Sequence, residues 1–173
     1  MPANPLALSL SRTLLRLLTA LNILAGIALA LLLAATFAME PRFLAYLEGL
    51  APEADVRALL WGLRLWGLIG LLVWLPILHF VLARLRAIVE TVRLGDPFVA
   101  ANAVRLRAIA WALLGLQLLH LVSGLFARAL SSGEIRFEWS FSLSGWLAVL
   151  LVFVLAGLFD EGARMRDELE GTV

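Results

Sequence analysis

The sequence predicts an all-α polytopic membrane protein with four transmembrane helices, and three observations support this fold class. First, 62% of the 173 residues are hydrophobic and 16% are charged, whereas soluble domains contain about 45–50% and about 25%. Second, the chain holds four runs of about 20 residues without Asp, Glu or Arg, and a helix of about 20 residues crosses the hydrocarbon layer of a bilayer. Third, these runs lack the alternation of a β-barrel, the other structure that satisfies the backbone in lipid.

The composition also excludes several kinds of chemistry. The chain contains no Cys, so it has no disulfide, thiolate metal site or cysteine nucleophile. All 14 basic residues are Arg, which excludes lysine-based catalysis, and the net charge of +1 gives no footprint for direct nucleic-acid binding. HExxH and GxSxG motifs are absent from the sequence. We therefore expect a non-enzymatic protein without a cofactor.

The first span is predicted at about 14–39. Its charge-free run, 17–39, is longer than the hydrophobic core of about 7–15 residues in a signal peptide, so we expect it to remain in the protein. The loop that follows contains Phe43, Leu44, Leu47 and Leu50, a pattern that predicts a short helix on the outer membrane surface.

The second and third spans are predicted at about 60–84 and 106–128, joined by a helical hairpin at about 84–107. Beyond the second span, apolar residues at helical spacing continue the helix. Gly95 is typical of a left-handed helix stop, Asp96 of an N-cap and Pro97 of a first helical position. Pro76 predicts a kink inside the second span.

The third loop and the C-terminal tail each leave two interpretations open. Apolar and polar residues alternate over 134–143, which predicts a short extracytoplasmic β segment or, alternatively, an extended segment with its aromatic rings among the lipid headgroups. The fourth span is predicted at about 142–160. The acidic tail, 160–173, is expected either to dock on the basic hairpin or to remain solvated, because surface ion pairs contribute only about 0–1 kcal/mol.

The arginines predict the orientation, since short cytoplasmic loops carry an excess of positive charge. Nine of the 14 arginines lie on the side that holds both termini and the second loop. The nine are Arg12, Arg16, Arg84, Arg86, Arg93, Arg105, Arg107, Arg164 and Arg166. We therefore expect a multi-pass protein of the bacterial inner (plasma) membrane with cytoplasmic N- and C-termini.

Polar residues inside the predicted spans are candidates for a functional site, because buried polar groups are costly in lipid. Gln117, His120 and Ser123 follow the outer half of the third span, and Arg64 begins the second span on the same side. These four residues could line a small intramembrane polar site. The alternative is a set of interhelical hydrogen bonds of about 0.6–2 kcal/mol each. His79 and His120 are predicted at different depths, which argues against a shared metal site.

Two stretches resemble a family of bacterial four-helix membrane proteins known as domain of unknown function 2975. The first is Gly95-Asp96-Pro97-Phe98 with Asn102 and Arg105-Leu106-Arg107, and the second runs from Leu158 to Glu170 and ends on Thr172-Val173. The resemblance extends over essentially the whole chain. It departs at Glu170-Gly171, where the family places Glu-Leu before Thr-Val. Because this family is often encoded beside a small helix-turn-helix regulator, the resemblance implies a membrane protein linked to such a regulator.

The predicted function is that of a membrane sensor or sequestering partner of a small cytoplasmic helix-turn-helix regulator. The expected partner-docking residues lie on the hairpin: Arg84, Arg86, Arg93, Asp96, Arg105 and Arg107. The alternative is a homo-oligomeric channel or small transporter, because four short spans enclose little volume in a single chain. Lipid is the other expected partner in either case.

Overall fold

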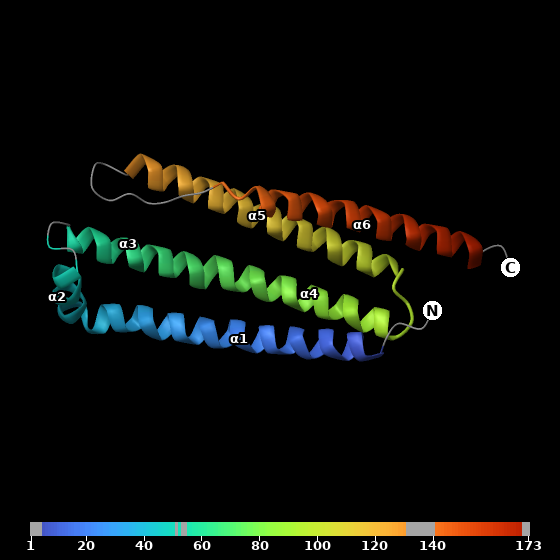
Figure 1. The fold of residues 1–173 in the computed structure, drawn as a ribbon, viewed down its shortest axis with the longest axis horizontal. Helices are drawn as coiled ribbons and strands as arrows, with labels where there is room; N and C mark the ends of the chain where they lie inside the picture. The colour runs from blue at the N-terminus through green and yellow to red at the C-terminus, as the bar shows by residue number, and fades with distance from the viewer. Residues whose placement is uncertain (1–4, 51, 53–54, 131–140, 171–173) are drawn as a thin grey trace. The chain divides into compact units, whose positions relative to one another are not determined.

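The computed structural model describes residues 5–50, 52, 55–130 and 141–170. Every regular element within these ranges is helical, and Figure 1 shows their arrangement along the chain. The elements are α1 (Pro5–Ala38), α2 (Glu40–Leu50), α3 (Val56–Ile69), the π-helix η1 (Gly70–Trp74), α4 (Leu75–Arg93), α5 (Ala100–Leu130) and α6 (Leu143–Glu170).

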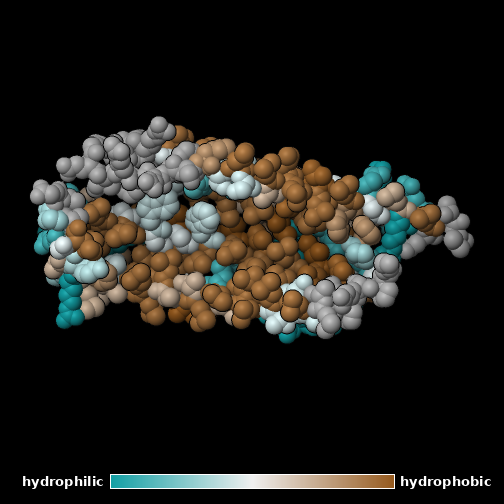
Figure 2. Space-filling model, viewed as in Figure 1, coloured by the Kyte–Doolittle hydropathy of each residue, from teal (hydrophilic) through white to brown (hydrophobic). Residues whose placement is uncertain are grey.

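Four helical stretches in the described part of the chain are long and apolar enough to cross a membrane. They are Ser9–Ala38, Val56–Arg93, Ala100–Leu125 and Leu143–Leu169. Large apolar side chains on these helices are exposed, as Leu24 and Leu31 illustrate with 64% and 66%. On the face drawn in Figure 2, hydrophobic residues cover the middle stretches of the helices and hydrophilic residues gather toward their ends. The predicted all-α fold with four membrane-type helices is confirmed.

Contacts divide the chain into two compact units, which we describe separately. One unit is Thr13–Leu82, and the other combines Met1–Arg12 with Ala83–Val173. The sequence predicts a single four-span membrane domain over residues 1–173, and this organisation remains a prediction.

In the unit Thr13–Leu82, α1 and the helix formed by α3, η1 and α4 run antiparallel, as Figure 1 shows. Glycines make this approach possible: a Cβ on Gly67 would lie 2.6 Å from a methyl carbon of Leu33, and one on Gly70 would lie 3.3 Å from Leu29. Close packing at small residues is the usual way in which helices associate in lipid. The absence of side chains at Gly67 and Gly70 therefore lets Leu33 and Leu29 of α1 pack directly against the neighbouring helix.

A π-helix precedes Pro76, the proline at which the sequence predicts a kink. Proline lacks the N–H that would donate to the carbonyl four residues earlier, and the wider turn Gly70–Trp74 lies where that hydrogen bond would be lost. Asn22 of α1 donates from Nδ2 to the Leu75 carbonyl at 3.2 Å. Its Oδ1 is buried and has no hydrogen-bond partner among the described residues. The amide therefore joins α1 to the first residue of α4, directly after the π-helix, through one hydrogen bond.

In the other unit, α5 and α6 form an antiparallel pair. Val149, Ala156 and Ala163 recur at seven-residue spacing on α6 and are buried, so they lie on one face of the helix. The buried hydrophobic side chains described on α5 are Ala103, Leu106, Ile109 and Ala110. Trp111 meets Phe153 edge to face with ring centroids 5.4 Å apart. Small side chains thus bring the two backbones together, and one aromatic pair fills the wider space.

The turn between α4 and α5 differs in part from its prediction. Gly95 has φ of 87°, so the predicted left-handed stop is confirmed. Asp96 and Pro97 do not begin the next helix, which starts at Ala100. The Asp96 carboxylate accepts a hydrogen bond from Arg166 instead of capping α5, and Asn102 donates to the Pro97 carbonyl at 2.9 Å. One tertiary bond and one local bond thus hold Asp96 and Pro97 in the turn, and α5 begins three residues after Pro97.

The β segment predicted near 134–143 falls mostly outside the described residues. Of its ten positions, only Phe141, Ser142 and Leu143 are described. Phe141 and Ser142 belong to no regular element, and Leu143 is the first residue of α6. The described end of the segment therefore contains no strand and leads into α6, and the Ser142 hydroxyl accepts from the Gly145 N–H at 3.2 Å in the manner of an N-cap.

Candidate functional site

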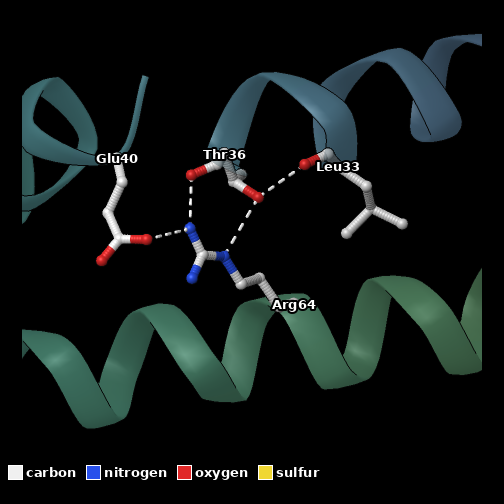
Figure 3. Close-up of polar contacts among 4 residues, drawn as sticks. All are labelled: Leu33, Thr36, Glu40 and Arg64. Atoms are coloured by element: carbon white, nitrogen blue, oxygen red, sulfur yellow. Dashed lines mark hydrogen bonds and ion pairs between the residues drawn. The ribbon is translucent and has the colours of Figure 1, made fainter. Parts of the chain in front are cut away.

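Arg64 on α3 is the most deeply buried charged residue described, with 2% of its surface exposed. A guanidinium is excluded from an apolar interior unless it is paired and hydrogen-bonded. The partners of Arg64 come from the end of α1 and the start of α2, as Figure 3 shows. This group of residues, Thr36, Phe37, Glu40, Trp61 and Arg64, is called the Arg64 cluster below.

Three hydrogen bonds hold the guanidinium in place. Its Nε donates to the Thr36 hydroxyl at 3.3 Å, and its Nη2 donates both to the Thr36 carbonyl and, at 2.9 Å, to a Glu40 carboxylate oxygen. The Thr36 hydroxyl in turn donates to the Leu33 carbonyl at 2.7 Å. The Thr36 carbonyl lies in the last turn of α1, where carbonyls have no partner within the helix. Arg64 therefore caps α1 from a neighbouring helix.

Two aromatic rings lie against the same cation. The guanidinium carbon is 4.0 Å from the centre of the Phe37 ring and 5.1 Å from that of Trp61. The two rings themselves meet nearly perpendicularly, 6.4 Å apart. Contacts of this kind contribute about 0.5–2 kcal/mol, more when the cation is desolvated. The rings thus shield Arg64 and lower the free-energy penalty of burying it.

Glu40 is the first residue of α2 and its side chain is 46% exposed. A carboxylate at a helix N-terminus interacts favourably with the helix dipole, and the cation at the end of α1 does the same there. Arg64 and Glu40 therefore stabilise the corner between α1 and α2 and fix that corner to α3. The short helix expected from Phe43, Leu44, Leu47 and Leu50 is confirmed as α2.

The predicted intramembrane polar site is divided between the two units. Arg64 belongs to Thr13–Leu82, and Gln117, His120 and Ser123 lie half-buried on α5 in the other unit. Gln117 packs on Gly145 of α6, where its side chain occupies the space of an absent Cβ. The four-residue site remains a prediction. Among the described residues, no three His, Asp or Glu side chains form a group that could hold a metal ion.

The end of α6 lies against the turn between α4 and α5. Arg166 donates to Asp96, and Arg107 pairs with Asp160 at 3.2 Å. Phe98 meets Phe159 with ring centroids 5.4 Å apart, and a Cβ on Gly162 would lie 2.7 Å from the Phe98 ring. We call the turn 94–99 and residues 159–169 the turn end. The docked alternative for the tail is therefore the one observed, although one of its two ion pairs has the arginine on the tail.

Most of the predicted docking residues make local contacts at this end. Arg93 pairs with Glu90 at 2.7 Å, Arg105 donates to the Asn102 amide oxygen at 2.7 Å, and Arg107 and Asp96 bind α6 as described. Arg84 and Arg86 lie exposed on α4. Asp96 and Arg107 thus bind α6 at the turn end, whereas the contacts of Arg93 and Arg105 lie within their own helices. The docking role itself remains a prediction.

Asn102 is a residue whose role the sequence did not reveal. It is fully buried, and its amide donates to the Thr91 hydroxyl at 2.6 Å as well as to the Pro97 carbonyl. A single side chain thereby joins the end of α4, the turn and the start of α5. The sequence signal that could have pointed to this role is its position five residues after Pro97, in the stretch that carries the family resemblance.

Comparison with protein families gives a match for this chain, whereas two other comparisons find none. No curated protein and no solved structure matches the chain. The family described as Protein of unknown function (DUF2975) matches residues 42–173. The matched region includes most of α2, the two α3 residues of the Arg64 cluster (Trp61 and Arg64) and the turn end. Because this match covers most of the chain, the protein belongs to the DUF2975 family.

Proposed function

We propose that this protein is a non-enzymatic sensor of the bacterial inner membrane that holds a small helix-turn-helix regulator at its cytoplasmic face. The observation that carries the proposal is the docking of the α6 tail on the turn 94–99. Asp96–Arg166, Arg107–Asp160 and the Phe98 contacts give the arginine-rich end a fixed tertiary surface. Such a surface can recognise a folded partner, whereas a solvated tail would have to become ordered on binding.

The extent of the helices supports this placement of the surface. Helix α6 continues from Asp160 to Glu170, which adds about 15 Å beyond its charge-free stretch. Helix α4 continues past Ala83 to Arg93 and presents Arg84 and Arg86 in an exposed position. Under the positive-inside rule these arginines face the cytoplasm, where a DNA-binding partner is found.

A sensor also needs a route between its two faces. The helix that carries Arg64 near its start continues through η1 into α4 and ends at Arg93. A change at the Arg64 cluster would therefore act on the same continuous helix that carries the exposed arginines. Release of a partner would need a difference of a few kcal/mol in its affinity for two states of that helix.

Charge reversal tests this proposal. The protein is purified from its native membranes in mild detergent, and co-purifying proteins are identified by mass spectrometry. We expect a small helix-turn-helix protein with the wild type and its loss with Arg86→Glu plus Arg93→Glu. The control is Arg42→Glu plus Arg57→Glu, which reverses the charge of two exposed arginines that the sequence places on the outer side of the membrane.

Retention of the partner by the Arg86→Glu plus Arg93→Glu variant would overturn the docking assignment. A homo-oligomer that co-purifies with no soluble protein would overturn the regulatory role and favour the channel or small transporter. In that case, ion flux through reconstituted vesicles, measured with Gln117 and His120 variants, would be the next experiment.

A further inference from the structure

Exposed apolar residues recur along one side of α6 and form an apolar stripe. Leu151, Val154, Leu158, Met165 and Leu169 are spaced by three, four or seven residues and are 65%, 57%, 63%, 53% and 72% exposed. On a helix this spacing places them on one side. The buried residues of α6 lie on the opposite side and pack against α5.

Lipid can cover only the first part of this stripe. Charged residues dominate α6 from Asp160 onward, so the hydrocarbon layer ends near that residue. Leu169 follows nine residues later, about 14 Å along the helix, whereas the headgroup region of one leaflet is about 5–8 Å thick. Leu169 therefore presents its exposed apolar surface to water, and Met165, about 8 Å along the helix from Asp160, lies at the outer edge of the headgroup region.

Phe98 extends this surface sideways. Its ring packs on Gly162, which precedes Met165 by one helical turn and Leu169 by two, and the residue remains 46% exposed. We call Phe98, Met165 and Leu169 the tail patch. Exposed apolar groups that gather in this way, outside lipid and beside charged residues, are typical of an interaction site.

The charge around the tail patch indicates what would bind there. From Asp160 to Glu170 the tail carries five acidic residues and two arginines. Arg164 pairs with Glu161 at 2.8 Å, Arg166 pairs with Asp96, and Arg107 of α5 pairs with Asp160 at 3.2 Å, so these pairs engage both arginines and two of the acidic residues. The net charge of residues 160–170 is −3. A second copy of this chain would bring an equally acidic tail against it, and like charges at an interface are unfavourable. A basic helix with one apolar face is complementary in both respects.

We propose that the tail patch is the docking site for a basic amphipathic helix of a partner protein. This inference rests on the proposed function, because it states the chemistry of the segment through which the regulator is held. The apolar face of that helix covers Met165, Leu169 and the edge of Phe98, and its basic residues face the acidic tail.

A synthetic helix tests the tail patch directly. The full-length protein is placed in phosphatidylcholine nanodiscs, and binding of a helical leucine–lysine peptide is measured by fluorescence anisotropy, with empty nanodiscs as the blank. A peptide with glutamate in place of lysine is the charge control. We expect the lysine peptide to bind at least tenfold more tightly than the glutamate peptide.

Substitution of the patch should remove this binding. Met165→Ser plus Leu169→Ser should lower the affinity for the lysine peptide at least tenfold, whereas Tyr46→Ser plus Leu50→Ser should leave that affinity unchanged. Tyr46 and Leu50 on α2 are matched controls because they are 68% and 64% exposed. Glu168→Arg changes an exposed acidic residue three positions after Met165, gives an independent variant, and should weaken binding of the lysine peptide only.

Equal binding to the wild type and the Met165→Ser plus Leu169→Ser variant would overturn the tail patch. Dimers of the wild type that this variant converts to monomers would overturn it too, because a second copy would then be the occupant.

The native co-purification distinguishes failure of the tail patch from failure of the regulatory role. A regulator retained by the tail variant but lost on Arg86→Glu plus Arg93→Glu refutes the tail patch alone. Selective peptide binding without any native regulator refutes the regulatory role alone.

Discussion

At the scale of single residues, Arg64 shows how a cation is accommodated inside a membrane-type helix pair. Its planar guanidinium donates in several directions at once, so it reaches the Thr36 hydroxyl, the Thr36 carbonyl and Glu40 while its faces contact Phe37. A lysine ammonium is a compact charge without this geometry or flat face. The requirement at position 64 is therefore for the shape of arginine as well as for its charge.

Loss of this guanidinium should destabilise the protein. Arg64→Met leaves the Thr36 carbonyl without its donor and Glu40 without its counter-ion, and removal of one partner of a buried pair costs about 3–5 kcal/mol. Because Glu40 is half-exposed and can be rehydrated, we expect about 2–3 kcal/mol. The free energy of unfolding is measured by SDS titration in mild detergent.

The matched control is Arg57→Met on the same helix, where the arginine is exposed, and its effect should stay within about 0.5 kcal/mol. Arg64→Lys should fall between the two, since it retains the charge and loses the multiple contacts. Equal stability of the Arg64→Met and Arg57→Met proteins would show that the Arg64 cluster contributes nothing to the fold.

The partners of Arg64 could not be predicted from the sequence. Thr36 and Glu40 lie 28 and 24 residues before it, and only the pairing of α1 with α3 brings them to the guanidinium. Charge counts identify Arg64 as a residue on one side of the membrane and say nothing about which helix it faces. For this reason the sequence grouped it with Gln117, His120 and Ser123 by depth alone.

At the scale of helices, packing on α6 depends on which glycine faces a neighbour. A Cβ on Gly162 would meet the Phe98 ring at 2.7 Å, and one on Gly145 would overlap the side chain of Gln117. Gly157 on the same helix has nothing within 4 Å of that position. The three sites therefore separate the effect of close packing from the general effect of glycine in a helix.

Alanine substitution of these glycines should rank in a defined order. Gly162→Ala should destabilise by about 1–3 kcal/mol, because Phe98 must leave its place on α6. Gly145→Ala should cost less, since the end of the Gln117 side chain can rotate away. Gly157→Ala should be neutral or stabilise by up to about 1 kcal/mol. Thermal unfolding of the three variants in one detergent gives the order, and a destabilised Gly157→Ala protein would contradict it.

The sequence predicts the helices better than it predicts their ends. The charge-free runs located all four membrane-type helices because length and apolarity are local properties. Gly95 was also identified correctly, since its positive φ is a local requirement. Asp96 was not, because its carboxylate binds Arg166, 70 residues away, and this contact competes with capping of α5. The π-helix before Pro76 was likewise missed, since proline indicates a disturbed helix without its form.

At the scale of the whole molecule, the distribution of charge makes the topology testable. The proposed orientation places the turn end in the cytoplasm and α2 outside. The chain contains no Cys, so a single introduced cysteine would be its only thiol. Exposed positions are available in both regions: Tyr46 on α2 at 68%, Leu94 in the turn at 73% and Leu169 on α6 at 72%.

Labelling of intact cells with a membrane-impermeant maleimide should therefore distinguish the two sides. Tyr46→Cys should react from outside, whereas Leu94→Cys and Leu169→Cys should react only after the membrane is made permeable. The physical reason is the positive-inside rule, by which the nine arginines of the termini and the second loop remain in the cytoplasm. Labelling of Leu94→Cys in intact cells would show that the orientation is the opposite of the proposed one. This result would also contradict the proposed function, because a cytoplasmic DNA-binding protein cannot contact a turn end that lies on the outer side of the membrane.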